Sequence, residues 1–217
     1  MTGSTGLLDA ATTRAWLLAS AAAVEAASER LTELDSAIGD GDHGANLRRG
    51  FRAVVAALDG FDPATPGELL VKAGMTLISS VGGASGPLYG SALRAVGKAL
   101  NTPQDAPEVD AARLATALTA GLEAVQRLGA AQTGDKTIVD AWTPAVAAFT
   151  AAAGQGLAVA SSAAAEAAEA GALGTAPLQA RKGRASYLGE RSIGHQDPGA
   201  TSTALLFRTL ADVLAQR

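Results

Sequence analysis

Along most of the chain, apolar residues recur every three or four positions between short polar turns that are rich in glycine. This spacing is typical of amphipathic helices, and clear strand patterns are scarce. It predicts helices at roughly 7–34, 45–58, 66–81, 85–100, 107–128, 134–153, 158–170 and 198–215. Because most connections are short, sequential helices should be antiparallel. The expected fold is therefore an all-α, up-down bundle of about eight helices.

Two connections and one helix start have features of their own. A turn is expected at Asn101–Pro107, and a long glycine-rich loop at Leu173–Pro198. A loop of that length inside a compact domain is usually functional. Thr65-Pro66-Gly67-Glu68 has the form of a capping box with proline at the first helical position, so a helix should begin there.

The composition supports close helix packing and narrows the class of protein. Of 217 residues 48% are hydrophobic, but much of this is alanine, the best helix former, and only 4% are aromatic. The length suits one domain, 1–217. A net charge of −4 gives no basic face for nucleic acid. The absence of cysteine excludes disulfides and thiolate metal sites, and suits a cytoplasmic protein.

Two segments bear on export and membrane insertion, and neither has the pattern that these require. Met1–Asp9 lacks a basic stretch before an apolar one, so we expect no secretory signal. Pro144–Ala165 is uncharged but consists mainly of small residues, without the dense large apolar content of a spanning helix. We interpret it as parts of two helices that are interrupted near Gly154-Gln155-Gly156.

Three aspartates, Asp35, Asp40 and Asp42, lie within eight positions and are separated by glycines. Crowded carboxylates repel one another, and a hard cation such as Mg²⁺ is the usual reason to tolerate them. Glycine lets the backbone fold tightly enough for the side chains to converge. An ordinary Asp-Gly turn is the competing interpretation, because both residues are common turn formers.

Three patterns come close to familiar binding motifs, but the neighbouring residues or the spacing exclude each one. Gly39–Gly44 matches the glycine pattern of dinucleotide-binding turns, but a helical pattern precedes it and its variable positions carry carboxylates. Gly129–Thr137 is close to a phosphate-binding loop, yet Asp135 interrupts it and no strand leads into it. The spacing of the three aspartates also does not fit a calcium-binding EF-hand loop.

A recurrent arrangement remains: four times, a polar glycine-rich turn leads directly into a helix. The turns are at 41–44, 82–86, 134–137 and 197–202. Each offers free N–H groups and the positive end of a helix dipole, which attract phosphate. In an up-down bundle these helices start at the same end as the carboxylates. The competing interpretation is that these are simply capped helix starts.

The long loop holds the one basic concentration, Arg181, Lys182, Arg184 and Arg191. A guanidinium there could contact phosphate or an acidic partner, although a solvated run of charge is the competing interpretation. His43 and His195 are the two histidines, and both are expected to act as hydrogen-bonding residues; a phosphorylated or catalytic histidine is the competing interpretation.

From about Trp16 to the last helix, the sequence resembles the L subunit of dihydroxyacetone kinase, the nucleotide-binding subunit. Four ordered motifs carry the resemblance: Leu34–Asp35 with Ile38–Asn46, Gly74–Leu77 with Ser79–Leu88, Gly134–Thr137, and Gln179–Ser202. The resemblance implies a closed barrel of eight antiparallel helices with a nucleotide, ADP or ATP, at one end.

The resemblance also assigns residues. It implies that Asp35, Asp40 and Asp42 bind two Mg²⁺ that bridge the phosphates. Phosphate and nucleotide contacts would fall on His43, Gly44, Ala45, Asn46, Ala84, Ser85, Gly129, Ile138, Arg184, Gly199, Ala200 and Thr201. The substrate-binding histidine of the family lies on a separate K subunit, so this chain alone is not expected to phosphorylate a ketose.

The expected activity is phosphoryl transfer from the bound nucleotide to a ketose on the K subunit. The donor would be either an M subunit of the phosphotransferase system or ATP. The stand-alone length of the chain favours a separate subunit. Two alternatives stay open: a nucleotide-loaded regulatory module that binds a transcription factor, and a subunit of an ATP-dependent kinase for another ketose.

Overall fold

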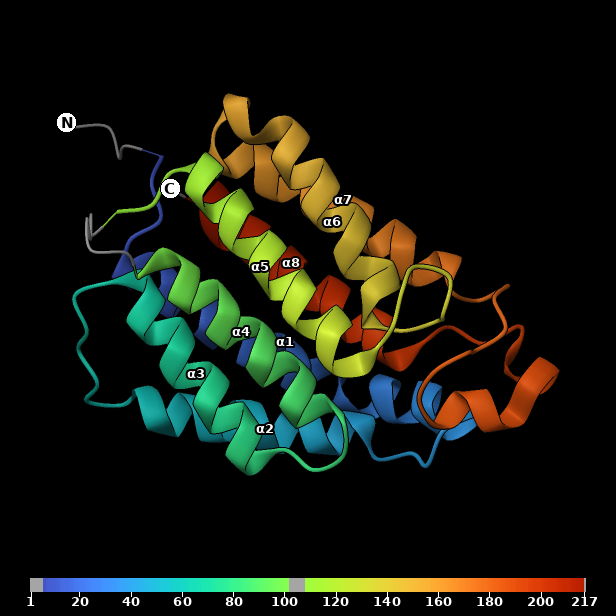
Figure 1. Cartoon of the computed structure of the whole chain (residues 1–217). Coiled ribbons are helices and arrows are strands. Elements are labelled where there is room, and N and C mark those ends of the chain that lie inside the picture. The colour runs from blue at the N-terminus through green and yellow to red at the C-terminus, as the bar shows by residue number, and fades with distance from the viewer. Residues whose placement is uncertain (1–5, 102–107, 217) are drawn as a thin grey trace.

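Helices account for most of the computed structural model, which describes residues 6–101 and 108–216 (Figure 1). In chain order they are α1 (Ala10–Ile38), α2 (His43–Leu58), α3 (Pro66–Ser80), α4 (Ser85–Leu100), α5 (Ala111–Gly129), α6 (Ile138–Ala152), the 3-10 segment η1 (Ala153–Gln155), α7 (Leu157–Gly174), the 3-10 segment η2 (Arg184–Ser192) and α8 (Pro198–Ala215). Over this part of the chain no strand forms, and an isolated bridge joins Leu8 to Val109. The predicted all-α fold is confirmed.

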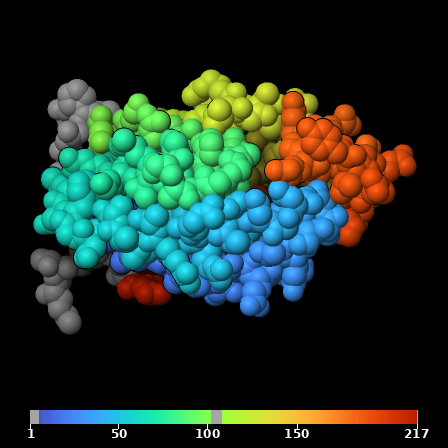
Figure 2. Space-filling model, turned by 90° about the horizontal axis from the view of Figure 1, so that it is seen from below, coloured from blue at the N-terminus to red at the C-terminus, as the bar shows by residue number. Residues whose placement is uncertain are grey.

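The helices form a closed ring. Each one packs against the next along the chain, and α8 packs against α1. Because short connections make consecutive helices antiparallel, α2, α4, α6 and α8 all begin at one end of the bundle. Figure 1 shows η2 and the connection into α8 at this end. In the space-filling view of Figure 2, the same connection, in orange, lies beside the blue residues at the start of α2.

Side-chain caps begin several helices where the sequence predicts them. At α3, the Thr65 hydroxyl accepts the Glu68 N–H at 3.3 Å, and the Glu68 carboxylate accepts the Thr65 N–H at 3.2 Å. Pro66 follows at the first helical position, where it has no N–H to leave unpaired. The predicted capping box is therefore confirmed.

Large side chains fill the inside of the ring. Trp142 from α6 meets Phe207 from α8 edge-on, with ring centroids 5.5 Å apart, and both rings are buried. The Trp16 indole N–H donates to the Leu206 carbonyl at 2.9 Å, which satisfies its polar atom. The cavity that remains among these residues measures only about 10 Å³. The barrel is thus a packed core and leaves the end of the bundle as the place for a site.

Small residues let neighbouring helices approach closely. Between α3 and α4, a Cβ on Gly74 would lie 2.5 Å from the Gly90 carbonyl oxygen, closer than real Cβ contacts come. Ala160, Ala164 and Ala168 of α7 are completely buried, which confirms that the alanine-rich stretch is a closely packed helix.

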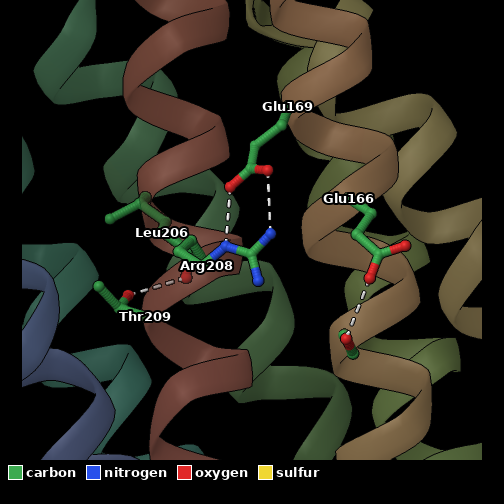
Figure 3. A network of polar contacts seen from close by, with 6 residues as sticks. Glu166, Glu169, Leu206, Arg208 and Thr209 are labelled. Carbon is green, nitrogen blue, oxygen red and sulfur yellow. Dashed lines mark hydrogen bonds and ion pairs between the residues drawn. The ribbon is translucent and has the colours of Figure 1, made fainter.

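An ion pair joins α7 to α8 on the outside of the bundle. Arg208 Nε and Nη2 donate to the two carboxylate oxygens of Glu169 at 2.7 and 2.9 Å (Figure 3). Since both side chains are partly exposed, this pair contributes at most about 1 kcal/mol to stability. Helix packing, more than surface charge, holds the ring together.

Some boundaries differ from the prediction. α1 continues to Ile38, so Asp35 lies on its last turn instead of in the loop that follows. α5 begins at Ala111, after the capping residue Asp110. Its predicted start at Pro107, and the predicted turn at 101–107 apart from Asn101, lie outside the described residues.

The predicted long loop is also shorter and more ordered than expected. α7 runs on to Gly174, and η2 occupies the middle of the connection to α8. In the described part of the chain, no helix has the length and apolar character needed to cross a bilayer.

Candidate functional site

A pocket of about 300 Å³ opens at the end of the bundle where the even-numbered helices begin. One side of it is acidic, another consists of helix starts, and a third is apolar. The apolar side comprises Ile38, Leu88, Val125 and Val139. Residues 182–185 of the connection before α8 also line the pocket. Segments far apart in the sequence therefore meet at a single concave surface.

The three predicted aspartates converge on this pocket. A carboxylate oxygen from each of Asp35, Asp40 and Asp42 lies within 4.8 Å of the others. Asp35 projects from the last turn of α1, and its Oδ2 accepts the N–H groups of Asp42 at 2.8 Å and His43 at 3.1 Å. Gly41, with a φ of +73°, makes the tight turn that brings Asp42 back beside Asp35. Oxygen ligands at this spacing fit Mg²⁺ or another hard divalent cation.

The four predicted helix starts all reach the pocket, but their free N–H groups differ. Thr137 caps α6 and Asp197 caps α8 through side-chain oxygens. No side chain caps the first turn of α2 or of α4 in the usual way. At α2 the His43 N–H donates to the Asp35 carboxylate, whereas at α4 Ala84 and Ser85 line the pocket. An uncapped helix start beside a pocket leaves donors and a positive dipole for an anion. The start of α4 is thus the best phosphate position in this wall.

His43 connects three of these helix starts by hydrogen bonds. Its Nδ1 lies 3.0 Å from the Ser85 hydroxyl of α4, and its Nε2 lies 2.9 Å from the Ser202 hydroxyl of α8. Burial lowers the pKa of His43, although Asp35 and Asp42 oppose that shift. The predicted hydrogen-bonding role of His43 is confirmed, and a neutral ring is the form that suits this environment.

Tyr89 extends the same network into the core. Its hydroxyl lies 2.7 Å from Ser202 Oγ, 2.8 Å from Thr203 Oγ1 and 2.9 Å from the Gly199 carbonyl oxygen. The side chain is buried, and that burial raises the pKa of the phenol. Sequence reasoning assigns no role to Tyr89, because a single tyrosine within a helical pattern carries no local signal.

Arg184 is the basic residue of the long connection that reaches the acidic cluster. Its Nη2 lies 3.0 Å from Asp40 Oδ2, and both side chains are partly exposed. Arg181 and Arg191 are exposed residues outside the pocket lining, whereas Lys182 belongs to it. Arg184 and Lys182 therefore fit the interpretation as site residues. Arg181 and Arg191 fit the interpretation as solvated charges.

The predicted contact residues divide into two groups. Those that line the pocket, besides the three aspartates, are His43, Ala84, Ser85, Gly129, Ile138, Arg184 and Gly199. Those that do not line it are Gly44, Ala45, Asn46, Ala200 and Thr201. Ala200 and Thr201 lie in the first turn of α8, where their N–H groups donate to Asp197.

The residues after His43 have structural surroundings. A Cβ on Gly44 would collide with the Ser28 carbonyl oxygen of α1, so this glycine allows α1 and α2 to touch. Asn46 is buried, and its Oδ1 accepts from Arg49 Nη2 at 2.8 Å. Ala45 is exposed. A motif read along the chain cannot separate these positions from the pocket-lining ones, because a helix turns adjacent residues in different directions.

Asp197 is a pocket residue that sequence reasoning took only for part of a turn. The carboxylate accepts the Ala200 N–H at 2.6 Å and is buried, and its pKa is raised to about 7. Burial is the main cause, and the carboxylates of Asp140 and Asp35 add to it. The Ala200 N–H and Lys136 act in the opposite direction. Asp197 thus carries a titratable proton at the edge of the pocket.

Comparison with known proteins places this end of the bundle in a family. The DAK2 domain model matches residues 37–212, which include Asp40, Asp42 and all four helix starts. The ADP-binding subunit DhaL of the PEP-dependent dihydroxyacetone kinase of Escherichia coli (strain K12) is 47% identical over 186 residues. The match covers 85% of this chain and 87% of that protein.

Two further relatives are longer proteins. L-erythrulose 1-kinase of Mycolicibacterium smegmatis is 42% identical over 192 residues, which is 86% of this chain and 32% of the kinase. The crystal structure of the dihydroxyacetone kinase of C. freundii in complex with AMP-PNP and Mg²⁺ aligns with a TM-score of 0.71 and 27% identity. It covers 95% of this chain and 34% of that one.

Proposed function

The chain belongs to the DAK2 domain family, and from this premise we propose that it is the nucleotide-binding phosphotransferase subunit of a dihydroxyacetone kinase. In this proposal, residues 1–217 form one domain that holds Mg-ADP or Mg-ATP in the pocket. The phosphoryl group passes to a ketose on a separate K subunit, in the cytosol. The similarity to an ADP-binding subunit and to a kinase solved with AMP-PNP and Mg²⁺ supports this choice of ligand.

One observation carries the proposal: three clustered carboxylates and the uncapped start of α4 line the same pocket. Carboxylates alone would repel a polyphosphate. Asp35, Asp40 and Asp42 would hold magnesium, which would supply the charge neutralisation that phosphate oxygens beside them need. The residues present fit this ion, because all three ligands are carboxylate oxygens within 4.8 Å of one another.

The other walls have matching roles in this proposal. N–H groups at the start of α4 bind phosphate oxygens, and Arg184 adds a guanidinium at the mouth. His43 holds the Ser85 hydroxyl in place through the 3.0 Å hydrogen bond. Leu88 and Val125 offer an apolar surface for the base, and Gly129 lines the pocket beside them.

Calorimetry tests the nucleotide site. Magnesium and ADP are titrated together into folded protein that has been stripped of metal and ligand. Wild type should release heat, and Asp40→Asn should bind at least about tenfold more weakly, because it loses a charged ligand. The matched control is Asp59→Asn, an exposed position at the end of α2 outside the pocket lining. Equal binding by wild type and Asp40→Asn would sink the proposal.

A reconstitution assay tests phosphoryl transfer. The chain is mixed with a K subunit, dihydroxyacetone and a phosphoryl donor, and the phosphorylated ketose is followed by ³¹P NMR. Transfer supports the kinase role, whereas tight nucleotide binding without transfer supports the regulatory alternative. Substituting L-erythrulose for dihydroxyacetone distinguishes the two ketoses that the related kinases name.

Nucleotide exchange identifies the donor. We propose an M subunit of the phosphotransferase system, since the similar subunit of E. coli is described as PEP-dependent. Protein purified with bound ADP that does not exchange with labelled ATP would agree with this donor. Rapid exchange would assign the chain to the ATP-dependent version.

A further inference from the structure

Lys136 is a buried lysine in the turn that leads into α6. Its side chain is only 1% exposed. Its backbone φ of +62° lies in the left-handed region, where residues other than glycine are uncommon. The sequence places it in Gly129–Thr137, the near match to a phosphate-binding loop, in which a lysine would reach towards phosphate. A charged group in such a position requires a structural account.

The ammonium group of Lys136 is directed at main-chain carbonyls. Nζ lies 2.8 Å from the Ser192 oxygen, 2.9 Å from that of Thr175 and 3.0 Å from that of Leu178. The carbonyls of Ala176, at 3.4 Å, and His195 complete the set. An ammonium has three hydrogens, so these five acceptors share them. The ammonium of Lys136 therefore has no hydrogen left to donate to a phosphate.

All five carbonyls belong to the connection between α7 and α8, residues 175–197. They come from the limb before η2 and from the limb that begins at its last residue, so one cation bridges the base of the loop. Two hydrogen bonds join the same limbs: the Gly194 N–H donates to the Ala176 carbonyl at 2.8 Å, and the Ala180 N–H donates to Ser192 Oγ at 2.9 Å. The Arg181 N–H also donates to the Asp135 carbonyl at 3.0 Å, next to Lys136. A small cluster in which Ala180 and Ala185 pack with Ile38 adds contact with α1.

The segment held in this way carries Arg184 to the mouth of the pocket. Arg184 opens η2, and its Nη2 reaches Asp40 at 3.0 Å. The connection contains the 3-10 turns of η2 but no α-helix or strand ladder, and unpaired main-chain groups would favour its opening into water. The position of Arg184 therefore depends on what holds the two limbs together.

We propose that Lys136 is a positioning residue: its ammonium fixes residues 175–195 and thereby keeps Arg184 at the pocket. The effect on the loop stands without any ligand, whereas the effect on nucleotide rests on the proposed function. Lys136 acts through Arg184 and does not itself contact phosphate.

Limited proteolysis tests the loop without nucleotide. Arg181, Lys182, Arg184 and Arg191 are trypsin sites within the segment. Lys136→Met removes the ammonium and keeps an unbranched side chain that is one atom shorter, so cleavage in 181–191 should become at least about tenfold faster through local opening. Lys98→Met, at an exposed position in α4, is the matched control and should leave the rate unchanged. Equal cleavage of wild type and Lys136→Met would overturn the proposal.

A double-mutant cycle tests the route through Arg184. Lys136→Met and Arg184→Ala should each weaken nucleotide binding by a similar factor. The double variant should bind nucleotide as tightly as the single variant that has the lower affinity. Multiplying effects would show that Lys136 supports the site by another route and would overturn the assignment. If wild type itself binds no nucleotide, the proposed function fails, and proteolysis still decides the role of Lys136.

A second variant covers the case in which Lys136→Met does not fold. Lys136→Arg keeps the charge but presents a planar fork in place of a compact ammonium. Faster cleavage in 181–191 with circular dichroism like that of wild type supports the proposal. Wild-type cleavage by this variant, with wild-type nucleotide binding, shows that the positive charge alone suffices and contradicts the ammonium geometry proposed here.

Discussion

Arg184 Nη2 lies 3.0 Å from Asp40 Oδ2, so an arginine is paired with one of the three clustered carboxylates. The side chains are 68% and 37% exposed, and an ion pair in that position contributes at most about 1 kcal/mol to stability. The pair is therefore weak enough to exchange partners. Asp40 can turn to a cation and Arg184 to an anion without loss of the fold.

This relationship predicts opposite effects of Arg184→Ala on metal and on nucleotide. Without nucleotide, the variant should bind Mn²⁺ or Mg²⁺ about two- to tenfold more tightly at low salt, because a competing positive charge is gone. With Mg-ADP, binding should weaken, because a phosphate ligand is lost. Calorimetry with the metal alone and with the metal and ADP together measures both affinities. Arg30→Ala, on the exposed surface of α1, serves as the control, and weaker binding of the metal alone would contradict the prediction.

Tyr89→Phe should destabilise the protein by about 1–2 kcal/mol, because it leaves buried hydrogen-bonding groups of Ser202 and Gly199 with one partner fewer. Urea unfolding measures the change in free energy. Tyr187→Phe is the matched control, since Tyr187 is 87% exposed and its hydroxyl should matter little. Equal stability of Tyr89→Phe and wild type would show that water replaces the phenol hydroxyl.

Asp197 predicts a pH dependence of stability. Its pKa of about 7 in the fold lies above the ordinary value of 3.8, so folding favours the protonated carboxyl. The stabilisation is complete below about pH 4 and is lost as the pH rises through about 7, a change of up to about 4 kcal/mol. Asp197→Asn keeps an oxygen for the Ala200 N–H and does not titrate.

The difference in unfolding free energy between wild type and Asp197→Asn should therefore shift against wild type from pH 4 to pH 8. Urea unfolding in metal-free buffers across this range measures it. A constant difference would mean that Asp197 titrates near its ordinary pKa, with its charge compensated in the fold.

Gly44→Ala should destabilise the fold by about 1–3 kcal/mol, because its Cβ would collide with main-chain and side-chain atoms of α1. Any loss of nucleotide binding would then follow from displacement of α2. The control is Gly154→Ala in η1, where a Cβ meets no atom within 4 Å and the expected change is within about 0.5 kcal/mol. Thermal unfolding of both variants gives the comparison, and a neutral Gly44→Ala would contradict the packing role.

Local signals made much of this architecture predictable. Helical spacing and the capping residue Thr65 place helix boundaries, and glycine-separated aspartates indicate a shared site, because these signals involve neighbouring residues. Lys136 binds carbonyl groups about 40 to 60 positions away, and main-chain acceptors leave no trace in side-chain sequence. The same reason explains η2, which has no periodic pattern and depends on this long-range contact and on packing against Ile38.

Because consecutive helices run in opposite directions, the pocket lies at one end of the bundle and a different set of connections lies at the other. Every wall of the pocket comes from one end, whereas the connections at 59–65 and 153–156 lie at the other and contribute nothing to it. Those distant turns are consequently free to be lengthened, cut or joined to another polypeptide while the chemistry stays intact. A fluorescent reporter inserted at Gly154, for example, should leave the pocket and its ligand binding unchanged.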